Sequence, residues 1–145
     1  MAELTVPEHD VLALAGRVLL AGVLGAMLGF EREWRGKEAG LRTNTLIAIG
    51  AALFTAMSLG FGGDPGRVAA QVVTGIGFLG AGAIMRTGGN VQGLTTAAMI
   101  WTNAAIGLTC GAGHVRLATA VTLIVLLAMI GLTPLDRMLD RRSGR

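Results

Sequence analysis

Five apolar stretches, each close to the length that spans a lipid bilayer, dominate this sequence of 145 residues. A helix needs about 20 residues to cross the hydrocarbon core. Charged residues make up only 14% of the chain, against roughly 25% in soluble domains. We therefore expect an all-α membrane protein, a compact bundle of about five transmembrane helices rich in small residues. The stretches cover residues 11–30, 45–61, 68–85, 94–110 and 115–132.

The basic residues indicate how these stretches are oriented. With the N-terminus outside, segments 31–44, 86–93 and 133–145 face the cytoplasm and hold nine of the 12 Lys and Arg residues. The positive-inside rule favours this orientation. If the third and fourth stretches formed a re-entrant pair instead, the N-terminus would lie inside.

The domain organisation follows from this pattern. Residues 1–10 form a short extracytoplasmic N-terminus, 11–132 the transmembrane domain and 133–145 a basic cytoplasmic tail. Residues 1–10 contain no Lys or Arg. We therefore expect no cleaved secretory signal, because such a signal needs a basic start.

Small residues are concentrated between residues 74 and 101, on both sides of a short polar elbow at 86–92. In a bilayer, small side chains let neighbouring helices approach closely. The stretch predicts a tight helical hairpin whose elbow is a turn. Alternatively, the elbow could offer backbone N–H groups to an anion beside Arg86. The predicted helix-packing residues are Gly25, Gly29, Gly75, Gly77, Gly80 and Gly82; Gly25 and Gly29 form a GxxxG pattern, more often an internal contact than a dimer face.

The segment 31–44 carries alternating charges. Opposite charges four residues apart support a helix, and three such pairs occur: Glu31/Arg35, Glu33/Lys37 and Glu38/Arg42. They could be weak surface pairs. Glu31 and Arg42 could instead sit at the hydrocarbon boundary, where a charge is costly and has a partner.

Polar residues within or beside the stretches could line an interior path or join helices by hydrogen bonds. The pattern Gly75-x-Gly77-x-x-Gly80 matches a dinucleotide motif, but it lies in an apolar stretch and lacks the acidic residue that such sites need. No catalytic residue or zinc site is visible, and no cofactor is expected, although Mg²⁺ could bind at residues that the sequence does not identify. The candidate polar residues are Glu31, Arg32, Glu33, Arg42, Asn44, Gln71, Arg86, Asn90, Thr95, Thr96 and Asn103.

The chain resembles the MgtC/SapB family of bacterial inner-membrane proteins. The matching segments are Gly25-x-x-x-Gly29-x-Glu31-Arg32-Glu33, residues 39–44, 64–73 and 75–82, and Asn90-Val91-x-Gly93 with the residues up to 98. The resemblance covers about residues 20–113. It implies a multi-span protein without established enzymatic activity, linked to growth in low magnesium and, in pathogens, to survival inside macrophages. One family member inhibits the rotary ATP synthase. Many members continue into a soluble cytoplasmic domain, so this sequence is expected to represent the membrane domain.

Two functions remain open at this stage. The first is a non-enzymatic regulator linked to magnesium limitation, stress adaptation or virulence. It would act through helix contacts, as a homo-oligomer or within a larger membrane complex such as the ATP synthase. The second is a small transporter or channel for Mg²⁺ or another ion. We expect the lipid bilayer as a partner and no nucleic acid.

Overall fold

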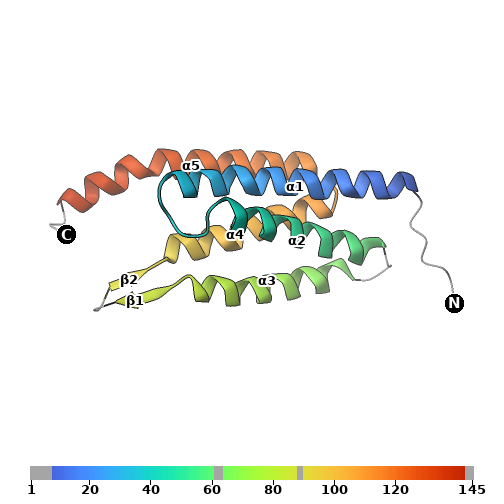
Figure 1. The fold of residues 1–145 in the computed structure, drawn as a ribbon, viewed down its shortest axis with the longest axis horizontal. Coiled ribbons are helices and arrows are strands. Elements are labelled where there is room, and N and C mark those ends of the chain that lie inside the picture. Colours follow the sequence, from blue (N-terminus) through green and yellow to red (C-terminus); the bar gives the residue numbers. More distant parts are fainter. Residues whose placement is uncertain (1–7, 61–63, 88–89, 143–145) are drawn as a thin grey trace.

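The structure, a computed structural model, describes residues 8–60, 64–87 and 90–142 of the chain (Figure 1). This part contains five helices and one short two-stranded sheet. The elements are α1 (Glu8–Trp34), α2 (Leu41–Gly60), α3 (Pro65–Gly82), β1 (Met85–Thr87), β2 (Asn90–Gln92), α4 (Leu94–Gly111) and α5 (Val115–Arg142).

The predicted apolar stretches correspond one by one to these helices. α1 and α5 are longer than predicted, with 27 and 28 residues, because the helix continues beyond the apolar run into charged sequence. The predicted tail at 133–145 is therefore helical up to Arg142. Most of the predicted N-terminal segment, residues 1–7, lies outside the described residues.

Local signals explain where α3 begins. The Asp64 side chain accepts a hydrogen bond from the Gly66 N–H, and Pro65 occupies the first turn. Both features are typical of helix N-termini, because they deal with N–H groups that have no partner in the helix.

Two helices of the described part are long and apolar enough to cross a membrane, at Val11–Trp34 and Val115–Pro134. α2, α3 and α4 have 20, 18 and 18 residues. At 1.5 Å per residue their lengths are about 30, 27 and 27 Å, close to the thickness of the hydrocarbon core. That these three helices also span the membrane stays a prediction.

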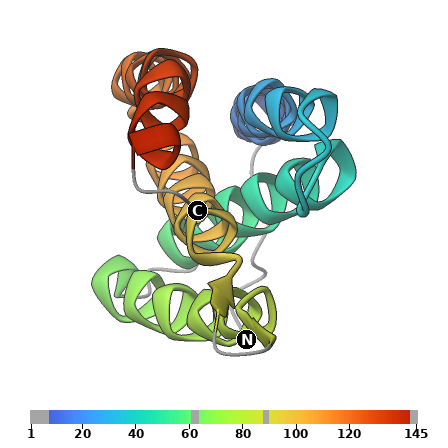
Figure 2. The same ribbon diagram turned by 90° about the vertical axis from the view of Figure 1, so that its left-hand side faces the viewer.

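α2 and α4 lie at the centre of the bundle. α1 packs mainly on α2, and α3 packs mainly on α4. In the end-on view, α1 and α5 lie on one side of this central pair and α3 on the other (Figure 2). The core where α1, α2, α4 and α5 meet includes Leu28, Ala48, Ile106 and Ala118. A second cluster around Ile76 and Ile100 joins α3 to α2 and α4.

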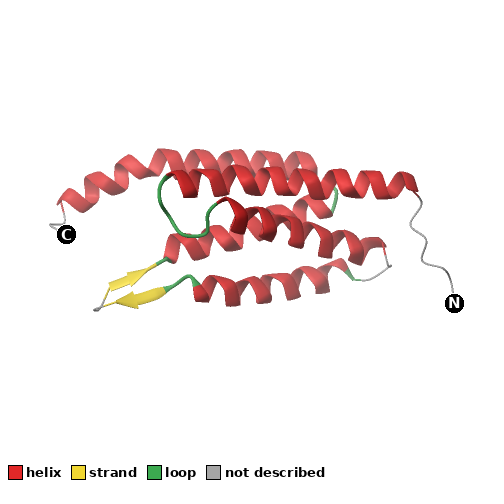
Figure 3. Ribbon diagram, in the orientation of Figure 1, coloured by secondary structure: helices red, strands yellow, loops and turns green. Residues whose placement is uncertain are grey.

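The elbow between α3 and α4 is a β-hairpin (Figure 3). β1 and β2 pair antiparallel, with Arg86 opposite Val91. The prediction of a simple turn within a helical hairpin was therefore incomplete. Gly93 ends the hairpin with a positive φ of 86°, and a Cβ there would lie 1.8 Å from the Ala83 carbonyl oxygen. This position therefore requires glycine.

The chain order brings the predicted cytoplasmic segments to one end of the bundle. The α1–α2 loop, the β-hairpin and the last turns of α5 lie together at the left of Figure 1. The α2–α3 and α4–α5 connections lie at the other end. The α1–α2 loop and the strands of the hairpin thus lie at the same end of the bundle, although they are far apart in sequence.

Candidate functional site

Glycines bring α1 into backbone contact with α2. A Cβ on Gly25 would lie 2.7 Å from the carbonyl oxygen of Asn44, and one on Gly29 would lie 2.7 Å from the Cα of Leu41. No larger side chain fits at either position without movement of the backbone. The GxxxG pattern therefore serves an internal contact, the more common of the two readings of such a pattern.

A buried polar contact joins α2 to α4. The Nδ2 of Asn103 donates to the backbone oxygen of Asn44 at 2.6 Å and to its Oδ1 at 3.1 Å. The Asn44 amide in turn donates to Gly40 O at 3.0 Å and to Ala39 O. Both asparagines are fully buried. The pair therefore fixes the start of α2, and the loop before it, against the middle of α4.

Arg32 joins the end of α1 to the start of α4. Its Nη2 donates to the Oγ1 of Thr96 at 2.7 Å. The two side chains are only 5% and 4% exposed. Burying a guanidinium group costs folding free energy unless its charge is compensated. The hydrogen bond to Thr96 offsets part of this cost and holds α1 against α4.

Glu31 joins the same end of α1 to α5. Its carboxylate forms an ion pair with Arg35, and Arg35 also donates to the Oγ1 of Thr133 on α5. Glu31 is 6% exposed, and within the part of the chain that the structure describes its carboxylate oxygens make no hydrogen bond. Glu31 is thus a buried acid whose ion-pair partner is Arg35; its place at the hydrocarbon boundary stays a prediction. We call these contacts between the four helices the polar junction; its residues are Glu31, Arg32, Arg35, Asn44, Thr96, Asn103 and Thr133.

The charged segment 31–44 is not one continuous helix. α1 ends at Trp34, and Gly36 takes a positive φ of 63°. The prediction that Glu33/Lys37 and Glu38/Arg42 pair along a helix was therefore wrong. The Oε2 of Glu33 instead accepts from the backbone N–H of Leu41 at 2.8 Å, at the start of α2. N–H groups at this position have no partner within the helix.

Other candidate residues do not join the polar junction. Gln71, for which an interior path and a hydrogen bond between helices were both open, is exposed on α3. Thr95, beside buried Thr96, is also exposed, because neighbouring residues of a helix face different directions. Arg42 and Arg86 are exposed as well. Asn90 belongs to β2, and its side chain lies outside the described residues.

Three of the four α3 glycines predicted to pack against helices contact no other helix of this chain. A Cβ on Gly75, Gly77 or Gly82 would meet nothing within 4 Å. Only Gly80 faces a neighbour, since its Cβ would lie 3.7 Å from the Cβ of Ala97. The other three lie on faces of α3 that point away from α4, which residue spacing alone does not reveal.

Sequence reasoning missed two glycines that carry a tight contact. A Cβ on Gly107 would lie 2.5 Å from the oxygen of Ala48, and one on Gly111 would lie 2.3 Å from the oxygen of Ala52. Both belong to α4 and press against α2. They form a second GxxxG pattern, a signal that was available in the sequence.

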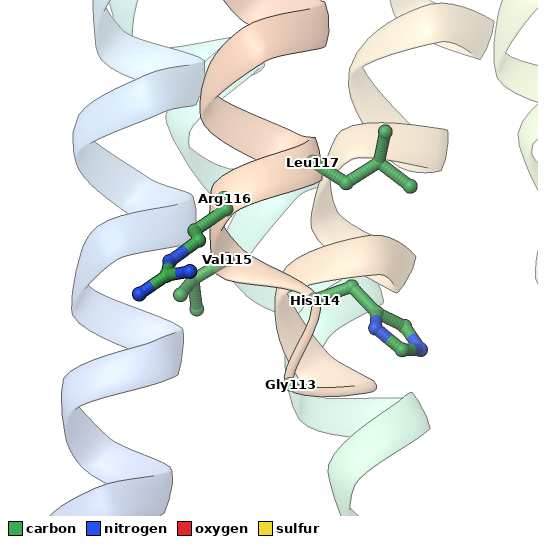
Figure 4. Close-up of a pocket in the computed structure, with 5 residues that line it drawn as sticks. All are labelled: Gly113, His114, Val115, Arg116 and Leu117. Carbon is green, nitrogen blue, oxygen red and sulfur yellow. The ribbon is translucent and has the colours of Figure 1, made fainter.

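A pocket of about 330 Å³ lies at the opposite end of the bundle, at the α4–α5 connection. It is lined by Gly113, His114, Val115, Arg116 and Leu117 (Figure 4). The side chains of Arg116 and His114 point to different sides of this segment. The pocket includes none of the candidate residues. Among the described residues, no cluster of three or more His, Cys, Asp or Glu could hold a metal ion.

Comparison with known proteins agrees with the resemblance seen in the sequence. The family model of the MgtC family matches residues 18–138. Protein MgtC of Salmonella typhimurium (strain LT2) is 56% identical over 114 residues, which are 78% of this chain and 49% of the relative. Protein MgtC of Brucella abortus (strain 2308) is 48% identical over 139 residues, 94% of this chain and 57% of the relative. This chain thus spans about half the length of the curated relatives it matches. No solved structure gives a significant match.

Proposed function

This chain belongs to the MgtC family, and we propose that it acts as a non-enzymatic regulator whose helices bind those of a partner in the bacterial inner membrane. The partner is a second copy or a larger membrane complex such as the ATP synthase. The physiological role is adaptation to magnesium limitation or other stress, and in a pathogen it contributes to virulence.

The outer face of α3 is the observation that supports this proposal most. Gly75 and Gly82 have open space beside them, and Phe78 between them is 82% exposed. Gln71 lies one turn before Gly75 and is exposed too. Small residues next to an amide are typical of contacts between helices in a membrane, where lipid cannot hydrogen-bond the amide.

The polar junction supports the same proposal from inside the molecule. Asn44 and Asn103 bond each other, and Arg32 and Thr96 do the same, so these groups join helices. Gln71 and Asn103, two residues of the suggested ion path, lie apart: one is exposed on α3 and the other is buried against α2.

We propose that all five helices cross the membrane, with the polar junction at the cytoplasmic side and the N-terminus outside.

A bulky residue on the open face of α3 tests the proposal. Gly75→Leu should leave the fold intact, because no atom lies within 4 Å of the added Cβ, and should abolish association with the partner. The matched control is Gly16→Leu on α1, where a Cβ also meets nothing within 4 Å. Association is measured by cross-linking in native membranes, and function by growth of the host in low magnesium. If both variants associate and grow like the unmodified protein, the proposal is wrong.

A transporter or channel for Mg²⁺ or another ion is the second candidate. One observation favours it: Glu31 and Arg32 are buried at one end of a helix that is apolar enough to cross a membrane. Charged residues in such positions often mark ion pathways. If this candidate is right, Glu31→Gln abolishes ion flux while the protein stays folded.

A further inference from the structure

Arg17 places a positive charge inside an apolar stretch. It belongs to the part of α1, Val11–Trp34, that is long and apolar enough to cross a membrane. The nearest acidic residues in the sequence are Asp10 and Glu31, which lie about 10 and 21 Å away along a helix that rises 1.5 Å per residue. A charge in such a segment usually pairs with another group or reaches the membrane surface.

The guanidinium of Arg17 packs against the connection between α4 and α5. A Cβ on Gly113 would lie 3.2 Å from the Arg17 Cζ, and 3.3 and 3.4 Å from its Nη1 and Nη2. The carbonyl oxygens of Leu108, Thr109 and Cys110, at the end of α4, already accept hydrogen bonds from this connection. Arg17 is half-buried. Among the side chains that the structure describes, no carboxylate pairs with it.

A second arginine reaches the same connection from α5. Arg116 is the second residue of α5, and its side chain is exposed. In Figure 4 it extends toward α1, whereas His114 points away. Gly113 and Arg116 both line the pocket of about 330 Å³, which has the size of a small-ligand site. The sequence holds no acidic residue between Asp64 and Asp136, so α4 and most of α5 carry no negative side chain.

Apolar side chains lie exposed around these two arginines. Leu12 on α1 and Leu117 on α5 are 76% and 57% exposed. Gly16 is exposed too, and a Cβ on it would meet nothing within 4 Å. Basic groups beside exposed leucines fit a molecule that is anionic at one end and apolar at the other. A soluble anion would leave the leucines without an apolar partner.

We propose that the phosphate of an anionic glycerophospholipid binds between Arg17 and Arg116, at the pocket beside the α4–α5 connection. Its acyl chains run along Leu12 and Leu117. Each guanidinium presents several donors to the phosphate oxygens, and such charge-assisted hydrogen bonds are stronger than neutral ones. The site rests on the proposed crossing of the membrane by α1, α4 and α5. It does not rest on the regulatory role, so a failure to find a protein partner leaves it intact.

Binding of phosphatidylglycerol to the purified full chain tests this site. The lipid is titrated in micelles of an uncharged sugar detergent, and native mass spectrometry counts the lipids bound. Arg17→Gln and Arg116→Gln should each weaken binding by about 10- to 100-fold, the loss expected for a hydrogen bond between charged groups. Arg67→Gln is the matched control, because it removes an exposed arginine from the start of α3, at the same end of the bundle. It should bind the lipid like the unmodified protein.

Two further ligands identify what the site recognises. Phosphatidylcholine, whose phosphate has a cationic neighbour, should bind more weakly than phosphatidylglycerol. Inorganic phosphate at matched ionic strength, which has no acyl chains, should not displace the lipid. A thermal unfolding curve shows that each variant is folded. Arg116 is exposed, so its variant decides the question if Arg17→Gln does not fold.

Four results would overturn the proposal. They are the absence of saturable phosphatidylglycerol binding, equal binding by Arg116→Gln and the unmodified protein, an equal loss in Arg67→Gln, and phosphatidylcholine binding as tight as that of phosphatidylglycerol. Displacement of the lipid by inorganic phosphate would also contradict it, because the ligand would then be a soluble anion.

Discussion

At the scale of single residues, the most informative contact is the one between Asn103 and Asn44. Both are fully buried, and one amide serves two acceptors on α2. When one partner of a buried hydrogen bond is removed, the remaining polar group has neither water nor protein to bond. The loss of folding free energy is then larger than the average net contribution of a hydrogen bond. The Asn103 amide thus stabilises the bundle. It also fixes the register between α2 and α4, because its bonds require Asn103 and Asn44 to lie side by side.

Asn103→Ala should lower the free energy of unfolding by about 1–3 kcal/mol. Thr102→Ala is the matched control, because the Thr102 hydroxyl bonds only Ala98 O of its own helix. This variant should stay within about 0.5 kcal/mol of the unmodified protein. Denaturation in mixed detergent micelles measures both values. Equal stability of the two variants would show that the amide contact contributes little.

The sequence identified both asparagines as polar candidates, but it did not pair them. They are 59 residues apart, and their contact depends on how α2 and α4 are rotated against each other. The same is true of Arg32 and Thr96, which are separated by 64 residues. Helix spacing predicts which residues share a face of one helix, and it carries no information on the neighbouring helix.

At the scale of elements, glycine spacing has two different meanings in this molecule. On α1 and α4 the glycines touch the backbone of α2, whereas on α3 most of them face open space. The patterns look alike in the sequence. Only the position of the neighbouring helix decides whether a glycine is a contact inside the chain or a free surface.

Gly107→Ala and Gly77→Ala separate these two meanings. The methyl group of Gly107→Ala would lie 2.5 Å from Ala48 O, whereas that of Gly77→Ala would meet nothing within 4 Å. Overpacking should cost Gly107→Ala about 1–3 kcal/mol of unfolding free energy. Gly77→Ala should be neutral or gain up to about 1 kcal/mol, because alanine favours a helix. A larger loss in Gly77→Ala than in Gly107→Ala would contradict the packing described here.

Element boundaries were predictable where hydrophobicity changes abruptly. α4 begins at Leu94, as predicted, and ends at Gly111, one residue beyond the prediction. The β-hairpin was not predictable, because its strands have only three residues each and polar sequences of this length fit a turn equally well. The end of α1 at Trp34 also escaped prediction, since charge pairs four residues apart favoured a longer helix.

At the scale of the whole molecule, most of the Lys and Arg residues belong to the segments at one end of the bundle, which we call the basic end. The α1–α2 loop and the β-hairpin lie together at the basic end. The up-and-down order of the helices brings these connections to the same end. From the positive-inside rule we predict that this end faces the cytoplasm. The family and the number of helices were predictable from the sequence, because long blocks of residues and five apolar runs carry that information.

Cysteine labelling checks this orientation in intact cells. In a Cys110→Ala background, Asp64→Cys and Arg116→Cys should react with a membrane-impermeant thiol reagent added outside. Arg42→Cys and Arg86→Cys should react only after the cells are opened. All four positions are exposed in the structure, so burial does not explain a difference. Labelling of Arg86→Cys from outside would rule out the proposed topology.

The central claim is that this protein acts through helix contacts and not by conducting ions. Uptake of Mg²⁺ into proteoliposomes that contain the purified, folded protein tests it most directly, with Glu31→Gln as the control for leak. The proposed function predicts no saturable uptake beyond that of protein-free liposomes, and no difference between the two proteins. Saturable uptake that disappears in Glu31→Gln would contradict it and make the buried acid part of an ion path.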